Sequence, residues 1–214
     1  MKRFYLCLHR LHYNCKIIGS RIILSKLGNM DQNFLFDPSI LADLDYSSWK
    51  SSFRPGVSPH TPPHGLKVRP LCATDYDKGF LGVLAQLTKV GTVTREQFMA
   101  RFNAMKDDKS YYVCVIEDLN KREVIGAATL VIEQKFIHSC GMRARVEDVV
   151  VDDTYRGKQL GKILTVVLIM LSKHLGCYKI SLECTDQKLP FYQQVGFKQD
   201  GTNYMVRRWE QNDV

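Results

Sequence analysis

Residues 144–161 constrain the fold more than any other stretch, because the hydrophobic period changes inside them. Residues 144–151 are rich in β-branched side chains and predict a strand. From Leu160 to Leu175 apolar residues recur at three- and four-residue steps, which predicts a long helix closed by Gly176. A strand that runs into a long helix through a glycine-containing loop predicts an α/β domain.

The flanking sequence predicts further strands and helices around this unit. Thr94 with Gln97 has the spacing of a capping box, and Thr74 with Asp77 also predicts a helix start. The predicted strands are residues 66–71, 111–117, 124–132, 144–151, 180–184 and 204–209, and the predicted helices are residues 74–87, 94–105, 160–175 and 189–195. In this order the first strands pair antiparallel, and the strand after the long helix pairs parallel.

The first 29 residues differ in charge from the rest of the chain. They carry six basic residues and no acidic one, whereas the remainder has 24 basic and 22 acidic residues. The formal net charge of +8 therefore lies largely outside the predicted domain, which argues against a nucleic-acid-binding protein. Two interpretations of residues 1–29 stay open: an upstream extension without a function of its own, and a peptide for organelle targeting.

Prolines and serines gather in the next segment, since five of the seven prolines lie between residues 37 and 64. This composition predicts a surface arm at residues 30–64 and a folded domain at residues 65–214. No apolar run reaches the ~18 residues of a membrane-spanning helix. The seven cysteines include no Cys-x-x-Cys pair, so we expect no metal site and a reducing, cytoplasmic location.

The loop at residues 156–161 has the composition of an anion-binding corner. The first N–H groups of a helix have no partner within the helix, and the helix dipole is positive at that end. Gly157 and Gly161 allow a ligand to approach the backbone, and Arg156 and Lys158 add positive charge. The spacing fits neither the Walker motif nor the dinucleotide-binding fingerprint. An ordinary strand-to-helix turn is the alternative interpretation.

The same loop resembles that of the GNAT superfamily of acetyl-CoA-dependent N-acetyltransferases, in which Arg/Gln-x-x-Gly-x-Gly/Ala follows the fourth strand. Here it is Arg-Gly-Lys-Gln-Leu-Gly, and Gln159 stands where the central glycine is usual. The resemblance implies a mixed, mostly antiparallel sheet with a splayed parallel strand pair, flanked by helices. Within the superfamily, residues 65–209 resemble the glucosamine 6-phosphate N-acetyltransferase family through four motifs: EQKFIH at 133–138, RVEDVV at 145–150, CYKI at 177–180, and Phe191-Tyr192 followed by Gly196-Phe197.

The resemblance implies a coenzyme site for acetyl-CoA. The backbone at Val149 is expected to polarise the thioester carbonyl, and the phenol of Tyr192 to protonate the departing thiolate, with a core tyrosine as the alternative. Lys188 stands where the family usually has an asparagine that reaches the pantetheine. The residues implied to contact the coenzyme are Val149, Val150, Val151, Arg156, Gly157, Lys158, Gln159, Leu160, Gly161, Glu183 and Tyr192.

The resemblance also implies a site for a phosphorylated sugar. Glu147 is expected to handle the amine proton with Asp148 beside it, and an ion pair with Arg143 or Arg145 is the alternative for either carboxylate. Adjacent residues of a regular strand face opposite sides, so the two carboxylates are not expected to face each other. The residues implied to contact the sugar are Thr88, Lys135, Phe136, Ile137, His138, Glu147, Asp148, Val149, Tyr178, Lys179 and Arg207. The family's last strand crosses to a second subunit, which implies a homodimer in which Arg207 completes the neighbour's site.

Together these features predict an enzyme that transfers the acetyl group of acetyl-CoA to the amine of D-glucosamine 6-phosphate, by direct attack without an acyl-enzyme. Two alternatives stay open. A protein N-acetyltransferase of the same fold needs a peptide groove rather than a cluster of cations around the acceptor. A non-catalytic acyl-CoA-binding module predicts that Tyr192→Phe changes nothing measurable.

Overall fold

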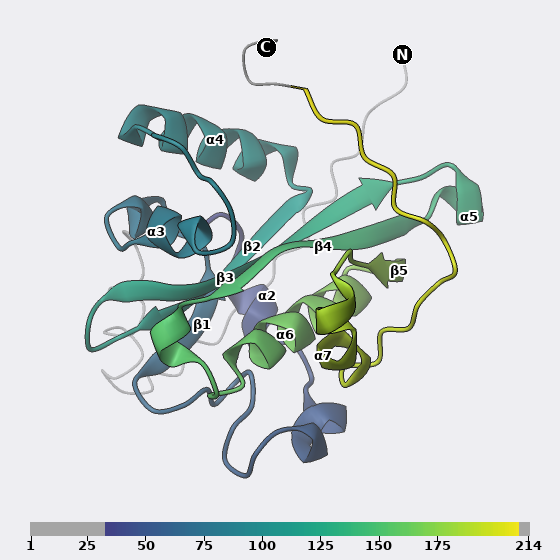
Figure 1. Ribbon diagram of the computed structural model, residues 1–214, viewed down its shortest axis with the longest axis horizontal. Coiled ribbons are helices and arrows are strands. Elements are labelled where there is room, and N and C mark those ends of the chain that lie inside the picture. Colours follow the sequence, from purple (N-terminus) through teal and green to yellow (C-terminus); the bar gives the residue numbers. More distant parts are fainter. Residues whose placement is uncertain (1–32, 210–214) are drawn as a thin grey trace, which may run out of the picture. The chain divides into compact units, whose positions relative to one another are not determined.

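A five-stranded sheet forms the centre of the computed structural model, which describes residues 33–209 of the chain. Its strands, in spatial order, are β1 (Leu66–Pro70), β2 (Tyr111–Asp118), β3 (Glu123–Gln134), β4 (Met142–Val151) and β5 (Cys177–Ser181). β1 to β4 pair antiparallel, and β4 pairs parallel with β5 (Figure 1). The predicted mixed, mostly antiparallel sheet is confirmed.

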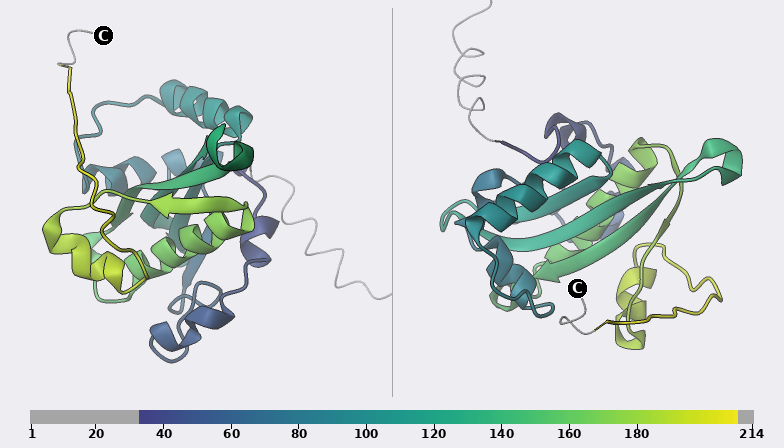
Figure 2. Two further views of the ribbon diagram at one scale, coloured as in Figure 1. Left: turned by 90° about the vertical axis from the view of Figure 1, so that its right-hand side faces the viewer. Right: turned by 90° about the horizontal axis from the view of Figure 1, so that it is seen from above.

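Helices cover both faces of this sheet (Figures 1 and 2). α3 (Phe80–Ala85) and α4 (Arg95–Asp108) lie on one face, and α6 (Leu160–His174) lies on the other with α2 (Ser39–Ala42) beside it. The remaining helical segments are η1 (Ser47–Ser52), η2 (Ala73–Tyr76), α5 (Ile137–Cys140), η3 (Asp153–Tyr155), η4 (Asp186–Lys188) and α7 (Leu189–Gln193). Among the described residues, no helix combines the length and the apolarity needed to span a membrane.

Two apolar clusters hold the helices on the sheet. Ile163, Leu164 and Leu168 of α6 are each 0% exposed and pack into one cluster. Phe98 and Phe102 of α4 pack into the other, on the opposite face. Because protein interiors are close-packed, the buried face of α6 fixes the N-terminus of this helix beside the end of β4.

The segment 33–64 belongs to the folded unit. Leu41 and Phe53 are buried in the same apolar cluster as α6. The prediction that the folded domain begins near Gly65 is therefore wrong. The apolar residues of this segment are separated by turns, so no strand or helix period in the sequence indicated their burial. The predictions for residues 1–29 lie outside the described residues.

Three other predicted elements differ in the structure. Gly79, at φ 82°, separates η2 from α3, so the helix predicted at 74–87 is two short segments. The strand predicted at 180–184 is β5, which begins and ends three residues earlier. Residues 204–209, predicted as a last strand, form neither strand nor helix. A strand needs a neighbour for its backbone hydrogen bonds, and within residues 33–209 this segment has none.

Candidate functional site

The corner between β4 and α6 is built as an anion-binding site. Gly157 (φ 78°) and Gln159 (φ 62°) take left-handed conformations, which turn the chain from the strand into the helix. The N–H of Ile163 donates to the carbonyl of Gln159 as the first hydrogen bond of the helix. The N–H groups of Leu160 to Lys162 therefore have no partner inside α6. These N–H groups and the helix dipole favour a phosphate group at this end.

The corner carries charges of both signs: Arg156 pairs with Asp153, and the Nζ atom of Lys158 lies 4.7 Å from the ring centroid of Tyr155. Arg156, Gly157 and Lys158 are exposed. A Cβ atom placed on Gly161 would lie 3.4 Å from the Cζ atom of Phe191, so α7 directly contacts the first turn of α6. The structure thus brings the predicted phosphate loop and the short helix with the predicted catalytic tyrosine to one place.

Gln159, at the position of the usual central glycine, is tied to the segment that precedes β1. Its Oε1 accepts a hydrogen bond of 3.0 Å from the backbone N–H of Arg54. A left-handed conformation costs a non-glycine residue roughly 1–2 kcal/mol, and this bond offsets part of that cost. The sequence contained no signal for the pairing, because the two residues are far apart along the chain.

Tyr155 and Gln86 hold the loop, and the sequence analysis missed both. Tyr155 is 7% exposed and donates a hydrogen bond of 2.5 Å to Oδ2 of Asp118, whose carboxylate raises the pKa of the phenol. Gln86 contacts Asp152 and Asp153, where the loop begins. The one available signal was an aromatic residue inside an otherwise polar loop, which is typical of a buried anchor.

β4 contains a β-bulge at the predicted reaction site. Thr129 of β3 pairs with Glu147 and Ala127 pairs with Val150, so two residues of β4 lie opposite one residue of β3. Asp148 is the residue with the unusual backbone, at φ 53°, and its side chain is exposed. The bulge therefore lies between Glu147 and Val150.

The bulge reverses the alternation of side chains along β4. The residues that pack against the α6 cluster are even-numbered before the bulge and odd-numbered after it: Ala144, Val146, Val149 and Val151. Val150 packs into the opposite cluster. The expectation that Glu147 and Asp148 face opposite sides assumed a regular strand, and it does not apply because Asp148 is part of the bulge.

β4 and β5 separate partway along their length. Their parallel pairing ends at Arg145 and Ser181, whereas β4 continues to Val151. Within residues 33–209, the edge of β4 beyond Arg145 therefore has no strand partner on the β5 side. The splayed parallel pair is present, and it leaves backbone groups on this edge free to bind a ligand.

Tyr192 lies on α7 and is half-buried. Burial, and secondarily the neighbouring Cys184, raise the pKa of its phenol above the ordinary 10.0. The phenol therefore stays protonated at neutral pH and can donate a proton or a hydrogen bond. Lys188, at the position of the usual asparagine, is the N-cap residue of the same helix.

The guanidinium of Arg145 forms ion pairs with three carboxylates. Its Nη2 atom lies 2.8 Å from Oε1 of Glu147 and 3.2 Å from Oε1 of Glu183, and its Nε atom lies 3.9 Å from Oε1 of Glu133. The ion pair that was the alternative for Glu147 is therefore formed, whereas Asp148 has no ion pair within residues 33–209. Glu183, predicted near the coenzyme, belongs to this carboxylate group.

The predicted sugar-phosphate ligands have partners within the chain. Lys135 pairs with Glu133, Lys179 pairs with Asp200 at 3.4 Å, and the ring of His138 lies against that of Tyr178 with 4.2 Å between centroids. Lys135 is also the main cause of the lowered pKa of Glu133. The structure thus holds these three side chains next to carboxylates or an aromatic ring.

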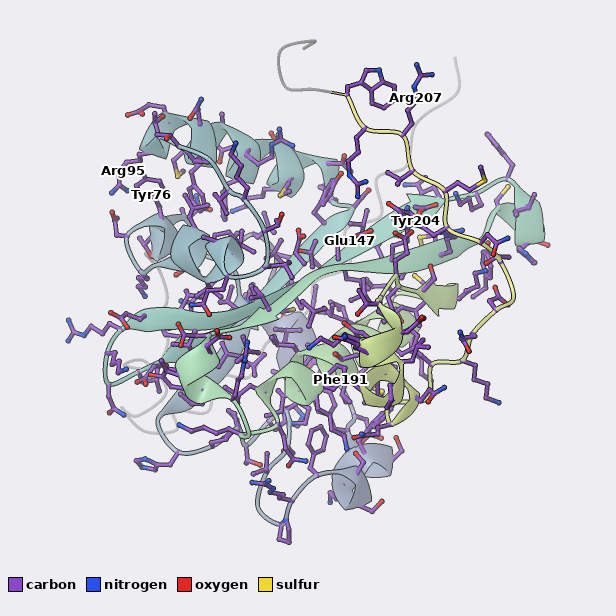
Figure 3. The ribbon with its side chains drawn as sticks, viewed as in Figure 1. Tyr76, Arg95, Glu147, Phe191, Tyr204 and Arg207 are labelled. Atoms are coloured by element: carbon purple, nitrogen blue, oxygen red, sulfur yellow. The ribbon has the colours of Figure 1, made fainter. Side chains whose placement is uncertain are left out.

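Arg207 lies on the tail at residues 201–209, where its guanidinium stacks over Trp209, 5.4 Å from the ring centroid. Figure 3 shows Arg207 toward the outer end of the tail. Thr88, just after α3, is exposed. Within residues 33–209, no hydrogen bond or ion pair joins Thr88 or Arg207 to the other predicted ligands.

The exposed large apolar residues of the β3–β4 turn and the tail are Phe136, Ile137, Tyr204, Met205, Val206 and Trp209.

One family model and several known proteins are similar to this chain. The acetyltransferase (GNAT) family model matches residues 83–197. A Drosophila melanogaster protein named probable glucosamine 6-phosphate N-acetyltransferase is 52% identical over 168 residues, which cover 78% of this chain and 77% of its own. Glucosamine 6-phosphate N-acetyltransferase 1 of Dictyostelium discoideum is 37% identical over 143 residues, or 66% of this chain and 90% of its own. The crystal structure of glucosamine-6-phosphate N-acetyltransferase from Arabidopsis thaliana is 36% identical, with a TM-score of 0.66, over 68% of this chain and 99% of that chain.

Proposed function

Because the chain belongs to the acetyltransferase (GNAT) family, we propose that it transfers the acetyl group of acetyl-CoA to the amine of D-glucosamine 6-phosphate. The observation that carries this proposal is the corner of unpartnered N–H groups at the start of α6, which lies against α7 and follows the unpaired edge of β4. The choice of acceptor is supported by the Drosophila relative, which is named for this reaction and matches 78% of the chain.

The coenzyme is proposed to bind across this corner. We assign its pyrophosphate to the N–H groups of the first turn of α6, with Arg156 and Lys158 supplying positive charge. The pantetheine chain is assigned to the unpaired edge of β4 at 149–151. Gln159 supports this assignment, because its side-chain amide is held by the backbone N–H of Arg54.

The chemistry is assigned to groups beside the bulge. Acetyl-CoA supplies the acetyl group as a thioester, and the sugar amine forms the new C–N bond while the sulfur leaves. We assign polarisation of the carbonyl to the backbone N–H at Val149, and protonation of the sulfur to Tyr192. Arg145 occupies Oε1 of Glu147, so Oε2 of the same carboxylate is assigned to the amine proton, directly or through a water. Asp148 borders the same point.

Direct transfer is proposed rather than an acyl-enzyme. A cysteine nucleophile acts as its thiolate, and a raised pKa disfavours that form. Burial raises the pKa of both Cys177 and Cys184, the cysteines on β5 and just after it. The five cysteines of residues 33–209 are free thiols, which supports our proposal of a reducing, cytoplasmic location.

We assign the sugar phosphate to Lys135, His138, Lys179 and Arg207, with Thr88 as a further contact. The proposal requires a homodimer, in which Arg207 of one subunit completes the site of the other. Its support is the set of exposed apolar side chains on the β3–β4 turn and the tail, because monomeric proteins seldom expose such residues together.

The test is acceptor profiling with the full-length chain, acetyl-CoA and a thiol-release assay. We expect release with D-glucosamine 6-phosphate and much less with D-glucosamine, because the phosphate is proposed to supply binding energy. Equal rates with both sugars would remove the phosphate assignment. Release with lysine peptides but with neither sugar would instead establish a protein N-acetyltransferase, and coenzyme binding without any release would establish a binding module.

A further inference from the structure

Gln86 bridges two parts of the molecule that are far apart in sequence. It lies immediately after α3, as the C-cap residue of that helix. Its side-chain Nε2 donates a hydrogen bond of 2.8 Å to Oδ2 of Asp152, and its Oε1 accepts one of 3.0 Å from the backbone N–H of Asp153. Both ends of one amide are therefore used on the two residues that open residues 152–161, here called the coenzyme loop.

Asp152, which accepts a hydrogen bond from Gln86, is itself held by other hydrogen bonds. The backbone N–H of Asp152 donates to the carbonyl of Ile125 on β3, at 2.9 Å. Oδ1 of Asp152 accepts hydrogen bonds from the backbone N–H and the hydroxyl of Thr154, which lies in η3. The Thr154 hydroxyl first and Gln86 second lower the pKa of this carboxylate. Gln86 thus joins the loop where the loop leaves the sheet, rather than at a mobile point.

Gln86 itself belongs to the connection between α3 and α4, residues 86–94. Thr88, the predicted sugar contact, is two residues after Gln86. The far end of this connection is held by Tyr76, whose hydroxyl donates to the carbonyl of Val93 at 3.1 Å. Arg95 covers the ring of Tyr76 at 4.9 Å, and Figure 3 shows the two side chains together. The connection is therefore fixed at both ends.

We propose that Gln86 is a positioning residue that sets the start of the coenzyme loop and ties it to the acceptor-side connection. The inference deepens the proposed function and rests on it. An amide suits this position because it donates to a carboxylate and accepts from a backbone N–H at once. A carboxylate at residue 86 would face that of Asp152, and an apolar side chain would leave Asp152 and Asp153 without these bonds.

The experiment compares Gln86→Ala, Gln86→Glu and the double variant Gln86→Glu/Asp152→Asn in the full-length chain. The double variant reverses the bond, because the new amide at position 152 donates to the new carboxylate at position 86, while the amide oxygen still accepts from Thr154. Gln97→Ala is the matched control, since it removes a side-chain amide that accepts a hydrogen bond of 2.8 Å from the N–H of Thr94, away from the coenzyme loop. Calorimetry with coenzyme A, thermal unfolding and the KM of each substrate are measured for all four variants.

For Gln86→Ala we expect a Kd for coenzyme A and a KM for acetyl-CoA about fivefold higher, because only part of the free energy of the two lost hydrogen bonds reaches the coenzyme site. Gln86→Glu is expected to weaken binding further, and the double variant to return to about twofold of wild type. Gln97→Ala is expected to bind coenzyme A as wild type does. Unchanged coenzyme binding in Gln86→Ala overturns the proposal, and so does a double variant as weak as Gln86→Glu. If Gln86→Ala fails to fold, the comparison of Gln86→Glu with the double variant decides.

Failure of the proposed function is distinguishable from failure of this inference. A wild-type chain that binds coenzyme A and acetylates no amino sugar removes the acceptor assignment. The calorimetric comparison of the Gln86 variants still decides whether this residue positions the loop, because it uses coenzyme A alone and needs no turnover.

Discussion

The coenzyme corner and the acceptor edge of the same sheet are built differently. The corner, residues 152–161, is anchored by Gln86 at its start, by the Tyr155–Asp118 hydrogen bond in its middle and by Arg54 at its end. The acceptor edge consists of the β3–β4 turn, β5 and the tail. There Phe136 is 95% exposed and Met205 is 90% exposed.

This difference indicates which half of the site one chain completes. At the corner, side chains from distant segments converge on the loop and the first N–H groups of α6 have no partner inside the helix, so one chain forms the whole of the proposed phosphate-binding surface. At the acceptor edge, Lys135 and Lys179 are paired with carboxylates, and apolar side chains face solvent. A second copy of the chain is the proposed cover of these side chains. A substitution in one half is therefore expected to leave the other half unchanged.

Tyr192→Phe is expected to have the largest effect, because Tyr192 is assigned to the reacting sulfur. Loss of a general acid lowers kcat by about 100-fold, while the Kd for coenzyme A stays within about twofold of wild type, since the ring and its packing are kept. Steady-state kinetics and calorimetry measure the two quantities. Tyr111→Phe, on a half-buried tyrosine of β2, is the control. A normal kcat in Tyr192→Phe would remove the residue from the mechanism.

Phe136→Glu is expected to change dimerisation and sugar turnover at the acceptor edge without changing coenzyme binding at the corner. The carboxylate that replaces this exposed ring is costly to bury against a second copy of the chain. In sedimentation we therefore expect the variant to run as a monomer and the wild type as a dimer. Turnover of the sugar falls by about 20-fold or more, because only residual dimers act. Coenzyme A binding stays unchanged.

Leu119→Glu is the matched control for Phe136→Glu. Leu119 is also an exposed apolar residue, 50% exposed, but it lies in the turn between β2 and β3. We expect a normal dimer and normal turnover. A Phe136→Glu monomer that retains full activity would show that the acceptor edge is complete in one chain.

Arg207→Ala is expected to act on the sugar side alone. A charge-assisted hydrogen bond to phosphate is worth more than a neutral one, so the KM for D-glucosamine 6-phosphate rises about tenfold. The KM for acetyl-CoA is unchanged, and the low rate with unphosphorylated D-glucosamine does not fall further. Arg208→Ala, at the neighbouring residue, serves as the control. An equal rise in the KM of both substrates would mean that the tail supports the whole site rather than the phosphate.

Gln159→Ala is expected to have the smallest effect and to act on the corner alone. Loss of the bond to Arg54 raises the KM for acetyl-CoA by about two- to threefold, because one exposed hydrogen bond is worth little. The KM for the sugar does not change. Kinetics with each substrate varied in turn measure both values, and a rise in the sugar KM instead would contradict the separation of the two halves.

Most of the sheet and the long helix could be predicted from local sequence pattern. The nearly continuous apolar run at 124–132 indicates a buried strand, and the three- and four-residue period of 160–175 indicates the buried face of a helix. The loop at 156–161 was predicted for the same reason, since a strand end, glycines and a helix start are all local signals. The prediction of one helix at 74–87 was wrong, because Gly79 adopts a left-handed conformation that interrupts it.

Local sequence pattern predicted neither the bulge at Asp148 nor the burial of residues 33–64. A bulge is defined by the pairing of β4 with β3, so strand alternation alone does not determine where the side chains of Glu147 and Asp148 lie. The arm is buried by contact with α6, which the arm's own proline-rich composition does not report.

The sequence by itself determined the order of elements, the phosphate loop and the residue types available for chemistry, because these depend on near neighbours along the chain. Tertiary structure alone decided that Gln86, Tyr155 and Arg54 hold that loop, that Arg145 pairs with Glu147, and that the tail stays unpaired. Hydrogen bonds and ion pairs between distant segments depend on how the sheet and helices pack, and no local pattern encodes that packing.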